Sequence, residues 1–416
     1  MEYAIVVDGY RFSKDYASYL RAKNILSIYI QSTKEPVTQM QATSTWDKED
    51  FALSLIFDGN FAHLHQQLSP YKINYVIAGS EAGVELADIL ADYYQVPNNG
   101  MAKSQARRNK YLMSEVLREN GVATIKQLKS NNSEDILQWA KENNTWPVVL
   151  KPLKGAGTED VYICNSPEKL KKRCQTIFET ANLFGETNNE LLVQEFLRGT
   201  EYVVNTVSCD GKHFISDIWK CSKRYIEHLD AVIYDREMLL PYEGEIQQSL
   251  IIYIKTVLDA LDFRYGAGHA EVMMTAKGPI LIEIGARVGG HVNVPAHNLG
   301  LNHNQLEWIV DAFTDPDAFS KKASKPYSIK KNISIIILAS SQEGKIKKIP
   351  LLKMINTLPS LYSVSMVVEP GDYLKITKDL FSSPGKVMLI HQDPKIVESD
   401  YQKIMDNEAQ GFIVEE

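Results

Sequence analysis

The chain of 416 residues lacks the features that mark several large classes of protein. Its four cysteines form no C-x-x-C pair and no pattern with histidine, which argues against a disulfide framework and a zinc site. No apolar run approaches the roughly 18 residues of a membrane span, and the start at Met1-Glu2 lacks the basic segment of a signal peptide. A formal net charge of −7 argues against a general binder of nucleic acid or of anionic membranes. These absences predict a cytoplasmic protein with no nucleic-acid partner and no membrane partner.

The length exceeds what one hydrophobic core normally serves and predicts two to four domains. In the first part of the chain, β-branched runs at 4–8, 25–30 and 74–78 alternate with helical patterns at 13–22 and 83–94. This alternation predicts a parallel, doubly wound α/β sheet. Ligands of such sheets bind at the carboxyl ends of strands, where Gly79-Ser80-Glu81 lies. A tight strand-to-helix turn with a serine N-cap explains the same three residues equally well.

Two basic segments come next. After the breaker Pro97–Gly100, a basic helix is predicted over Lys103–Glu119, and a solvated face is the plain alternative to a binding role. The strand Trp146–Lys151 then leads to a glycine-rich turn at 154–158. Glycine permits close approach to phosphates and lysine supplies countercharge. Because the turn has neither the P-loop pattern nor G-x-G-x-x-G, it is a weak phosphate signal by itself.

The rest of the chain has a mixed pattern of strands and helices, followed by a mainly β pattern. An antiparallel segment is predicted over 190–222, with a hairpin turn at Asp210-Gly211, and helices over 249–261 and 305–314. From Lys331 onward, short strands and a last helix at 397–408 predict a closing β-rich subdomain. The predicted division is therefore 1–100, 101–195, 196–330 and 331–416.

The stretch Ala267–Val294 contains several residues suited to metal and phosphate binding. Its two apolar runs, separated by a Lys-Gly turn signal, predict a β-hairpin, and each run contains one acid, Glu271 or Glu283. Buried carboxylates are costly unless a cation pairs with them. Arg287 and the pair Gly289-Gly290 follow, and together these groups suit Mg²⁺ and a phosphoryl group in transit. The alternative is a hairpin whose acids point to solvent.

These motifs occur in a known order: an α/β domain, a lysine helix, V-V-L-K-P with a glycine loop, Q-E-F-L, and E…E-x-x-x-R. The order resembles the ATP-grasp superfamily of carboxylate–amine ligases over nearly the whole chain. It is most similar to the L-amino-acid ligases (dipeptide synthetases) of bacilli, including the arginine-preferring type of rhizocticin biosynthesis. The resemblance implies an ATP-grasp fold, α/β and α+β, with a Rossmann-like pre-ATP-grasp domain first and a β-rich subdomain last.

The resemblance also implies a role for each matched residue toward ATP. The residues expected to contact the phosphates are Lys110, Lys151 and a closing loop of Gly155, Ala156, Gly157 and Thr158. The residues expected to bind adenine and ribose are Glu195, Phe196 and Leu197 of the hinge, and Glu201. The closed loop would exclude water from a reactive intermediate.

At the hairpin, Glu271 and Glu283 match the Mg²⁺ ligands, and Arg287 matches the arginine that stabilises the transferring phosphoryl group. Gly289-Gly290 would present backbone amides to the substrate carboxylate. One position departs from the pattern. Many ATP-grasp enzymes have Asn two residues after the second acid, where this chain has Gly285, which leaves coordination of the second Mg²⁺ open.

The implied reaction joins two amino acids through an acyl phosphate and releases ADP and phosphate. ATP and Mg²⁺ are the implied cofactors, with two ions and with Mn²⁺ as a substitute, and a homodimer through the N-terminal domain is common in the superfamily. Two alternatives stay open: another ATP-grasp ligase, of biotin-carboxylase-like or purine-pathway type, and a nucleotide-binding regulatory module without catalysis. Gly285 alone supports the second.

Substrate candidates form a weaker set. The acids in the segment where these ligases build their pocket are Glu227, Asp230 and Asp235. Acids there suit an ammonium or guanidinium group and give the hypothesis of L-arginine as the first residue, with a solvated loop as the alternative. His291 and Asn293 are expected to line the pocket or to form a turn, and His269 to touch phosphate or to be structural.

Overall fold

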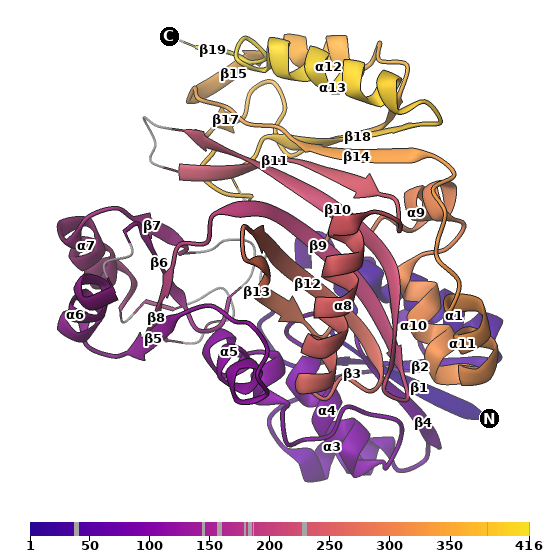
Figure 1. The fold of residues 1–416 in the computed structure, drawn as a ribbon. Coiled ribbons are helices and arrows are strands. Elements are labelled where there is room, and N and C mark those ends of the chain that lie inside the picture. The colour runs from indigo at the N-terminus through magenta and orange to yellow at the C-terminus, as the bar shows by residue number, and fades with distance from the viewer. Residues whose placement is uncertain are drawn as a thin grey trace.

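The structure is a computed structural model that describes residues 1–36, 41–143, 146–155, 160–178, 180–181, 185, 187–226, 231–380 and 382–415. Figure 1 shows a large sheet in the middle of the molecule, with the N-terminal domain below it. A small four-stranded sheet with two helices, here called the lid, lies to one side. The C-terminal strands continue this sheet upward, and the last helices lie above it.

The N-terminal domain is a parallel sheet with helices on both faces. Its strands in spatial order are β3 (Leu53–Ile56), β2 (Ile25–Gln31), β1 (Glu2–Val7) and β4 (Ile73–Ala78). Its helical elements are η1 (Tyr10–Phe12), α1 (Ser13–Ala22), η2 (Lys48–Asp50), α3 (Phe61–Leu68) and α4 (Val84–Tyr93). Leu20 of α1 shares a buried cluster with Val6, whereas Leu68 of α3 and Leu90 of α4 share another with Ile5. The predicted doubly wound sheet is therefore confirmed.

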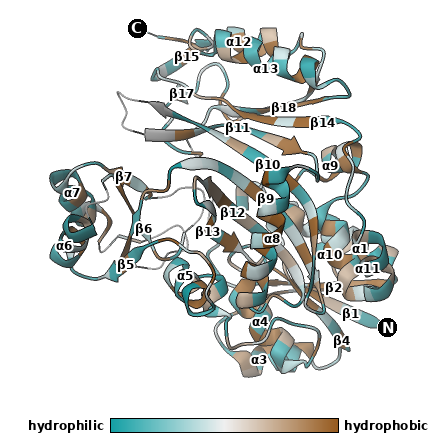
Figure 2. Cartoon of the chain, viewed as in Figure 1, coloured by the Kyte–Doolittle hydropathy of each residue, from teal (hydrophilic) through white to brown (hydrophobic). Residues whose placement is uncertain are grey.

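The lid is antiparallel. Its strands in spatial order are β5 (Gln127–Ser130), β8 (Leu191–Glu195), β6 (Val148–Pro152) and β7 (Tyr162–Cys164). Helices α6 (Ser133–Asn143) and α7 (Pro167–Ile177) pack on it through one buried cluster that includes Leu137, Leu170 and Val193. Figure 2 shows hydrophobic residues along the strands and hydrophilic residues on the outward sides of these helices.

The central sheet has eight strands. In spatial order they are β13 (Gly278–Gly285), β12 (Gly266–Thr275), β9 (Gly199–Cys209), β10 (Lys212–Ile226), β11 (Ala231–Leu240), β14 (Asn332–Ile337), β18 (Gly385–His391) and β16 (Leu361–Met366). The helices packed around it are α5 (Lys110–Glu119), α8 (Glu245–Ala260), α9 (Val294–Leu301), α10 (Gln305–Thr314) and α11 (Pro316–Ala323). Leu117 of α5 and Ile254 of α8 lie in the same buried cluster, so α5 packs with the central core, and Gln127 of the lid strand β5 also donates to the Tyr111 carbonyl of α5.

The C-terminal strands continue the central sheet. β14 pairs with β11, where Arg236 lies opposite Ile336, and β18 and β16 follow. Helices α12 (Pro350–Ile355) and α13 (Pro394–Glu408) cover this end, beside a small sheet of β17 (Tyr373–Leu374), β15 (Gly344–Lys348) and β19 (Ile413–Val414). The β-rich end predicted after residue 331 is present, and it shares hydrogen bonds with the strands before it.

The helix predicted over 103–119 is two elements, η3 (Gln105–Arg107) and α5. Asn109 between them is extended, and its side chain accepts two backbone N–H groups of α5 as an N-cap. Arg107 is fully buried and forms a 3.0 Å ion pair with Asp88, so this side chain is not part of a solvated face. The buried ion pair and the cap explain why the helix begins only at Lys110.

The prediction of an antiparallel segment over 190–222 is confirmed in part. The hairpin turn at Asp210-Gly211 joins β9 and β10, with positive φ at both residues. β8, however, pairs with β5 and β6 of the lid. The chain therefore passes from the lid to the central sheet between Glu195 and Gly199, where the sequence shows no breaker before Gly199.

Two further expectations concern cysteine and membranes. All four cysteines are buried and unpaired, as predicted for reduced small hydrophobic residues. Within the ranges that the structure describes, no helix is long and apolar enough to cross a membrane.

Candidate active site

Polar side chains occupy one face of the central sheet. Residues directly opposite one another on paired strands point to the same face. One row across β13, β12, β9 and β10 consists of Glu283, Glu271, Val203 and Trp219; the next consists of Gly285, His269, Asn205 and Asp217. A third row, from β12 to β11, consists of Met273, Glu201, Cys221 and Glu237. The predicted convergence of Glu271 and Glu283 on neighbouring antiparallel strands is confirmed.

Two lysines approach these acids from outside the sheet. Lys110 is the first residue of α5; its Nζ lies 3.0 Å from Glu283 Oε2 and donates to the carbonyl of Gly155 at 3.1 Å. Lys151 lies on β6 and is only 4% exposed. Burial lowers the pKa of Lys151 to about 8, with Glu283 opposing the shift and Lys110 adding to it. The lid and α5 thus bring two cationic groups to the acidic end of the sheet.

The acids themselves fit a divalent cation. Burial, then Glu283 and Glu201, raise the pKa of Glu271 to about 8. Burial also disfavours the charged form of Glu283, but Lys110 and Lys151 outweigh it and hold its pKa below the ordinary value. A divalent cation would relieve the negative potential that raises the Glu271 pKa, and carboxylate oxygens are ligands that Mg²⁺ prefers. Glu271 and Glu283 are therefore the residues suited to hold Mg²⁺.

Arg287 follows β13 at the edge of the same face. Its Nε donates to Glu81 Oε2 at 3.1 Å, and its Nη1 donates to the carbonyl of Val288 at 3.0 Å. The Arg287 side chain is 18% exposed. Glu81 lies between β4 and α4, so the strand end predicted as a ligand-binding edge of the N-terminal sheet meets the hairpin at this point.

The glycine pair after Arg287 differs from expectation at its first member. The N–H of Gly289 donates to Gln305 Oε1 at 2.9 Å, because Gln305 is held by the carbonyls of Thr206 and Gly268. The Gly289 amide is therefore occupied rather than open to a substrate carboxylate. Within the described ranges no hydrogen bond engages the Gly290 N–H, so this second amide of the pair is open to an acceptor.

The candidates for adenine and ribose lie where the lid meets the central sheet. Glu195 ends β8, and its Oε1 accepts from the backbone N–H of Lys126 at 2.9 Å. Half-buried Phe196 and Leu197 belong to the connection into β9. Of the predicted phosphate loop, Gly155 is described and half-buried, and the residues outside the described ranges are Ala156, Gly157 and Thr158.

Glu201 lies on β9 beside this connection and is 4% exposed. Its carboxylate accepts from Lys223 Nζ at 2.6 Å and from the Tyr234 hydroxyl at 3.2 Å. The tyrosine leaves Oε1 able to accept a further donor, since a carboxylate oxygen has two lone pairs. The acid expected at the ribose is thus held in place by its neighbours on β10 and β11.

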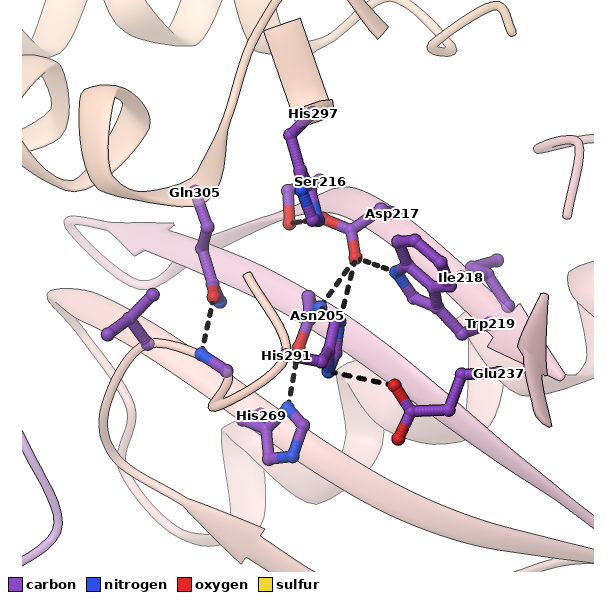
Figure 3. Close-up of polar contacts among 12 residues, drawn as sticks. Asn205, Ser216, Asp217, Ile218, Trp219, Glu237, His269, His291, His297 and Gln305 are labelled. Atoms are coloured by element: carbon purple, nitrogen blue, oxygen red, sulfur yellow. Dashed lines mark hydrogen bonds and ion pairs between the residues drawn. The ribbon is translucent and has the colours of Figure 1, made fainter. Parts of the chain in front are cut away.

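A buried polar network, drawn in Figure 3, lies on the same face of the sheet as these acids. Asn205 is at its centre: its Oδ1 pairs with His269 Nδ1 at 2.8 Å, and its Nδ2 donates to Asp217 and meets His291 Nε2 at 3.1 Å. Trp219 Nε1 also donates to Asp217, which is fully buried. Burial would raise the pKa of Asp217, but the histidines and Asn205 hold it well below its ordinary value. Burial, followed by Arg287, lowers the pKa of His269.

His291 lies between two acids in this network (Figure 3). Its Nε2 is 4.0 Å from Asp217 Oδ1, and its Nδ1 is 4.0 Å from Glu237 Oε2. The Glu237 Oε2 atom is buried and has no hydrogen-bond partner within the part of the chain that the structure describes. Asn293 instead caps α9, where its Oδ1 accepts from the N–H of Ala296 at 3.1 Å. The structure therefore brings His291 to the sheet face and places Asn293 in the turn role.

Asp217, His291 and His297 also bring three metal-binding atoms within 4.8 Å of one another. His297 Nδ1 pairs with the carbonyl of Asn293 at 2.9 Å. Neutral donors, including Trp219, already satisfy Asp217 Oδ1. We interpret this group as a wall of the site because hydrogen bonds from Asn205, Ser216 and Trp219 already engage the Asp217 carboxylate.

The sequence interpretation missed Asn205, Asp217 and Glu237. A weak signal was present, because each is a polar residue with an apolar residue directly beside it in its strand, on the face that Glu201 or Trp219 shares. Among the predicted pocket acids, Asp235 is bound elsewhere: it lies 3.1 Å from Arg224 Nε and accepts from the Tyr401 hydroxyl at 2.7 Å. The other two, Glu227 and Asp230, lie outside the described residues.

Asp217→Ala is expected to lower the free energy of unfolding by about 3 kcal/mol, because buried N–H donors of Asn205 and Trp219 would lose their acceptor. Urea unfolding followed by tryptophan fluorescence measures this. The matched control is Asp210→Asn, which removes an exposed ion pair with Arg264 whose side chains are 63% and 58% exposed. It is expected to cost less than about 1 kcal/mol. Equal losses in the two variants would contradict the role given to Asp217.

The fold and the site together define a class, and comparison with known proteins agrees. The sequence pattern of the family described as "ATP-grasp domain" matches residues 144–295. The crystal structure of an L-amino acid ligase from Bacillus licheniformis superposes with a TM-score of 0.75 over 100% of this chain and 99% of that chain, at 16% identity, which shows the shared fold.

Two further proteins are similar to the chain in sequence. The chain is 33% identical to dapdiamide A synthase of Enterobacter agglomerans over 418 residues, covering 99% of this chain and 97% of that protein. It is 23% identical to an L-arginine-specific L-amino acid ligase of Bacillus subtilis over 221 residues, 52% of each protein. The chain belongs to the ATP-grasp family and is an ATP-dependent carboxylate–amine ligase. Enzymes of this class bind ATP with Mg²⁺.

Proposed function

We propose that the chain joins two amino acids and releases a dipeptide, ADP and phosphate. The observation that carries this proposal is the opposed pair Glu271 and Glu283 with three cationic side chains around it, Lys110, Lys151 and Arg287. Such a set suits negative charge on phosphates and on a substrate carboxylate. Full-length similarity to dapdiamide A synthase and the shared fold of an L-amino acid ligase support an amino-acid substrate.

In the proposed reaction, a carboxylate oxygen of the first amino acid attacks the γ-phosphorus of ATP. The bond from that phosphorus to the β–γ bridging oxygen breaks, which gives an acyl phosphate and ADP. The amine of the second amino acid attacks the acyl carbon, phosphate leaves with its oxygen, and the nitrogen loses a proton. Two Mg²⁺ ions, when bound, supply neutralisation of phosphate charge.

The chain's own groups have three tasks in this proposal. Lys110 and Lys151 bind phosphate oxygens from the lid side, with Glu201 at the ribose. Arg287 stabilises the phosphoryl group while it moves, and the Gly290 amide receives the carboxylate. The lid, whose last strand β8 leads into β9 through a short connection, excludes water from the acyl phosphate.

We include L-arginine as the first amino acid in the proposal. Support comes from the Bacillus subtilis relative and from Glu237, whose buried Oε2 has no hydrogen-bond partner in the described ranges. A buried carboxylate oxygen of this kind suits an ammonium or guanidinium group. The acids first considered for this role give less support, because Asp235 is already paired with Arg224.

The test is phosphate release from Mg-ATP with each of the twenty amino acids, singly and in pairs, and product masses. Release confined to certain pairs with a dipeptide mass is the expected result. Dependence on bicarbonate would instead indicate a carboxylase-type reaction, and nucleotide binding with no release in any pair would contradict the ligase proposal. Equal release with arginine and with alanine or methionine as first residue would overturn the arginine preference alone.

A further inference from the structure

The turn Gly79-Ser80-Glu81 of the N-terminal domain has no task in the proposed reaction, yet it contacts Arg287. Glu81 Oε2 accepts from Arg287 Nε at 3.1 Å, and Glu81 Oε1 accepts from Arg108 Nη1 at 3.2 Å. The Glu81 side chain is 13% exposed and that of Arg108 is 6% exposed. Each carboxylate oxygen of Glu81 therefore binds a separate guanidinium group in a largely dry contact.

This contact depends on a glycine in the hairpin. A Cβ added at Gly285 would lie 2.7 Å from Glu81 Oε2 and 3.2 Å from Arg287 Nε. The first distance is too short for any side chain without displacement of the carboxylate. Gly285 therefore leaves the space in which Glu81 reaches Arg287, which gives a physical reason for glycine at this position.

The N-terminal domain also holds the segment that follows Arg287. Arg11, in η1, donates to the carbonyl of Gly290 at 2.8 Å and to that of Val292 at 3.0 Å. Glu81 thus fixes a side chain at the start of the segment, and Arg11 fixes its backbone further on. The two contacts are independent, since they come from different strand ends of the N-terminal sheet.

We propose that Glu81 is a positioning residue: from the N-terminal domain it fixes the direction of the Arg287 guanidinium, and Gly285 provides the room. Arginine has a long, flexible side chain whose ordering has an entropic cost. With Nε on Glu81 and one N–H of Nη1 on Val288, the second N–H of Nη1 and both N–H groups of Nη2 are left as donors for phosphoryl oxygens within the described structure. The catalytic part of this inference rests on the proposed function of Arg287.

The first experiment compares Glu81→Gln with Glu81→Asp and with the matched control Glu85→Gln. Glu85 lies in the first turn of the neighbouring helix α4 and is 42% exposed; its carboxylate lies 3.2 Å from Lys154 and 3.7 Å from Arg108. Glu81→Gln is expected to lower kcat for ADP release by about 10- to 100-fold with little change in the KM for ATP. Glu81→Asp should recover part of the loss, and Glu85→Gln should change kcat less than about twofold.

Gly285→Ala is expected to reproduce the loss, because its methyl group would displace the Glu81 carboxylate. In an Arg287→Ala background, Glu81→Gln should cause no further loss, since a residue that acts through Arg287 has nothing left to position. A loss of equal size in both backgrounds would overturn the proposal. So would an effect confined to the KM of an amino acid, which would indicate direct substrate binding.

A readout independent of catalysis separates this inference from the proposed function. The Nε–H resonance of Arg287 in an NMR spectrum, assigned from its absence in Arg287→Lys, should move in Glu81→Gln and in Gly285→Ala but not in Glu85→Gln. An unmoved resonance in Glu81→Gln would show that the ion pair is absent in solution and would overturn the inference. If no amino-acid pair supports ADP release, the proposed function fails, while the resonance still decides the ion pair.

Discussion

Replacement of Arg287 by alanine is expected to lower kcat for amino-acid-dependent ADP release by about 100- to 1,000-fold. The guanidinium lies at the edge of the acidic sheet face and is 18% exposed. A fixed cation at a site of developing negative charge contributes most in the transition state, so kcat and kcat/KM for ATP should fall together. Steady-state ADP release with the preferred pair of amino acids, beside Mg-ADP affinity by calorimetry, measures both.

The matched control for this prediction is Arg264→Ala, which removes an arginine that is 58% exposed and pairs with Asp210. Its kcat should remain within about twofold of the parent protein, because an exposed ion pair contributes little. A normal kcat in Arg287→Ala would show that Arg287 is not needed for the chemistry. A large loss of Mg-ADP affinity would place it in nucleotide binding instead.

The second large effect concerns Mg²⁺ and pH. The pKa of Glu271 is raised from 4.5 to about 8 by burial and by Glu283, so the metal-free protein has this acid protonated at pH 7. Mg²⁺ requires the ionised form, and binding at pH 7 should therefore release about one proton. The apparent affinity should fall about tenfold for each pH unit below 8 and level off above it. Calorimetry in buffers of different ionisation enthalpy measures the proton directly.

Glu271→Gln is expected to abolish both the proton release and the activation by Mg²⁺, whereas Glu243→Gln, at an exposed position, should change neither. The stability of the metal-free fold has the corresponding pH dependence. The pKa of Glu271 in the folded state lies above its ordinary value. Protonated Glu271 therefore contributes fully to the free energy of unfolding below pH 4.5, and this contribution is lost as pH rises through 8. Mg²⁺ affinity independent of pH between 6 and 8 would contradict this account.

Patterns among residues close in sequence were enough to predict much of this structure. The helix over Ser13–Ala22 has the bounds that its composition predicts, and the hairpin signal with one acid per strand placed Glu271 opposite Glu283. Both inferences need only neighbours in sequence or one turn between two strands. The helix break at Asn109 was missed because a buried ion pair between Arg107 and Asp88 decides it, and a basic residue gives no sign of such a partner.

The contacts that complete the site join residues far apart in the chain. Asp217 reaches His291 through Asn205 on a third segment, and Glu81 reaches Arg287 from another domain. No local period encodes such a meeting, since it depends on how whole sheets pack. Gly285 is an example. The motif shows only that this chain lacks the usual Asn at this position, and the space beside Glu81 explains why glycine is present.

The continuous central sheet has a consequence for chimaeric enzymes. Exchange of the C-terminal segment between relatives at residue 330 would place a foreign strand against β11, whose residues Arg236, Glu237 and Met238 pair with β14. The Glu237 carboxylate on that strand lies 4.0 Å from His291 Nδ1. A modular swap at this apparent boundary would therefore also disturb the strand that contains Glu237, and a recombination library should treat β11, β14 and β18 as one block.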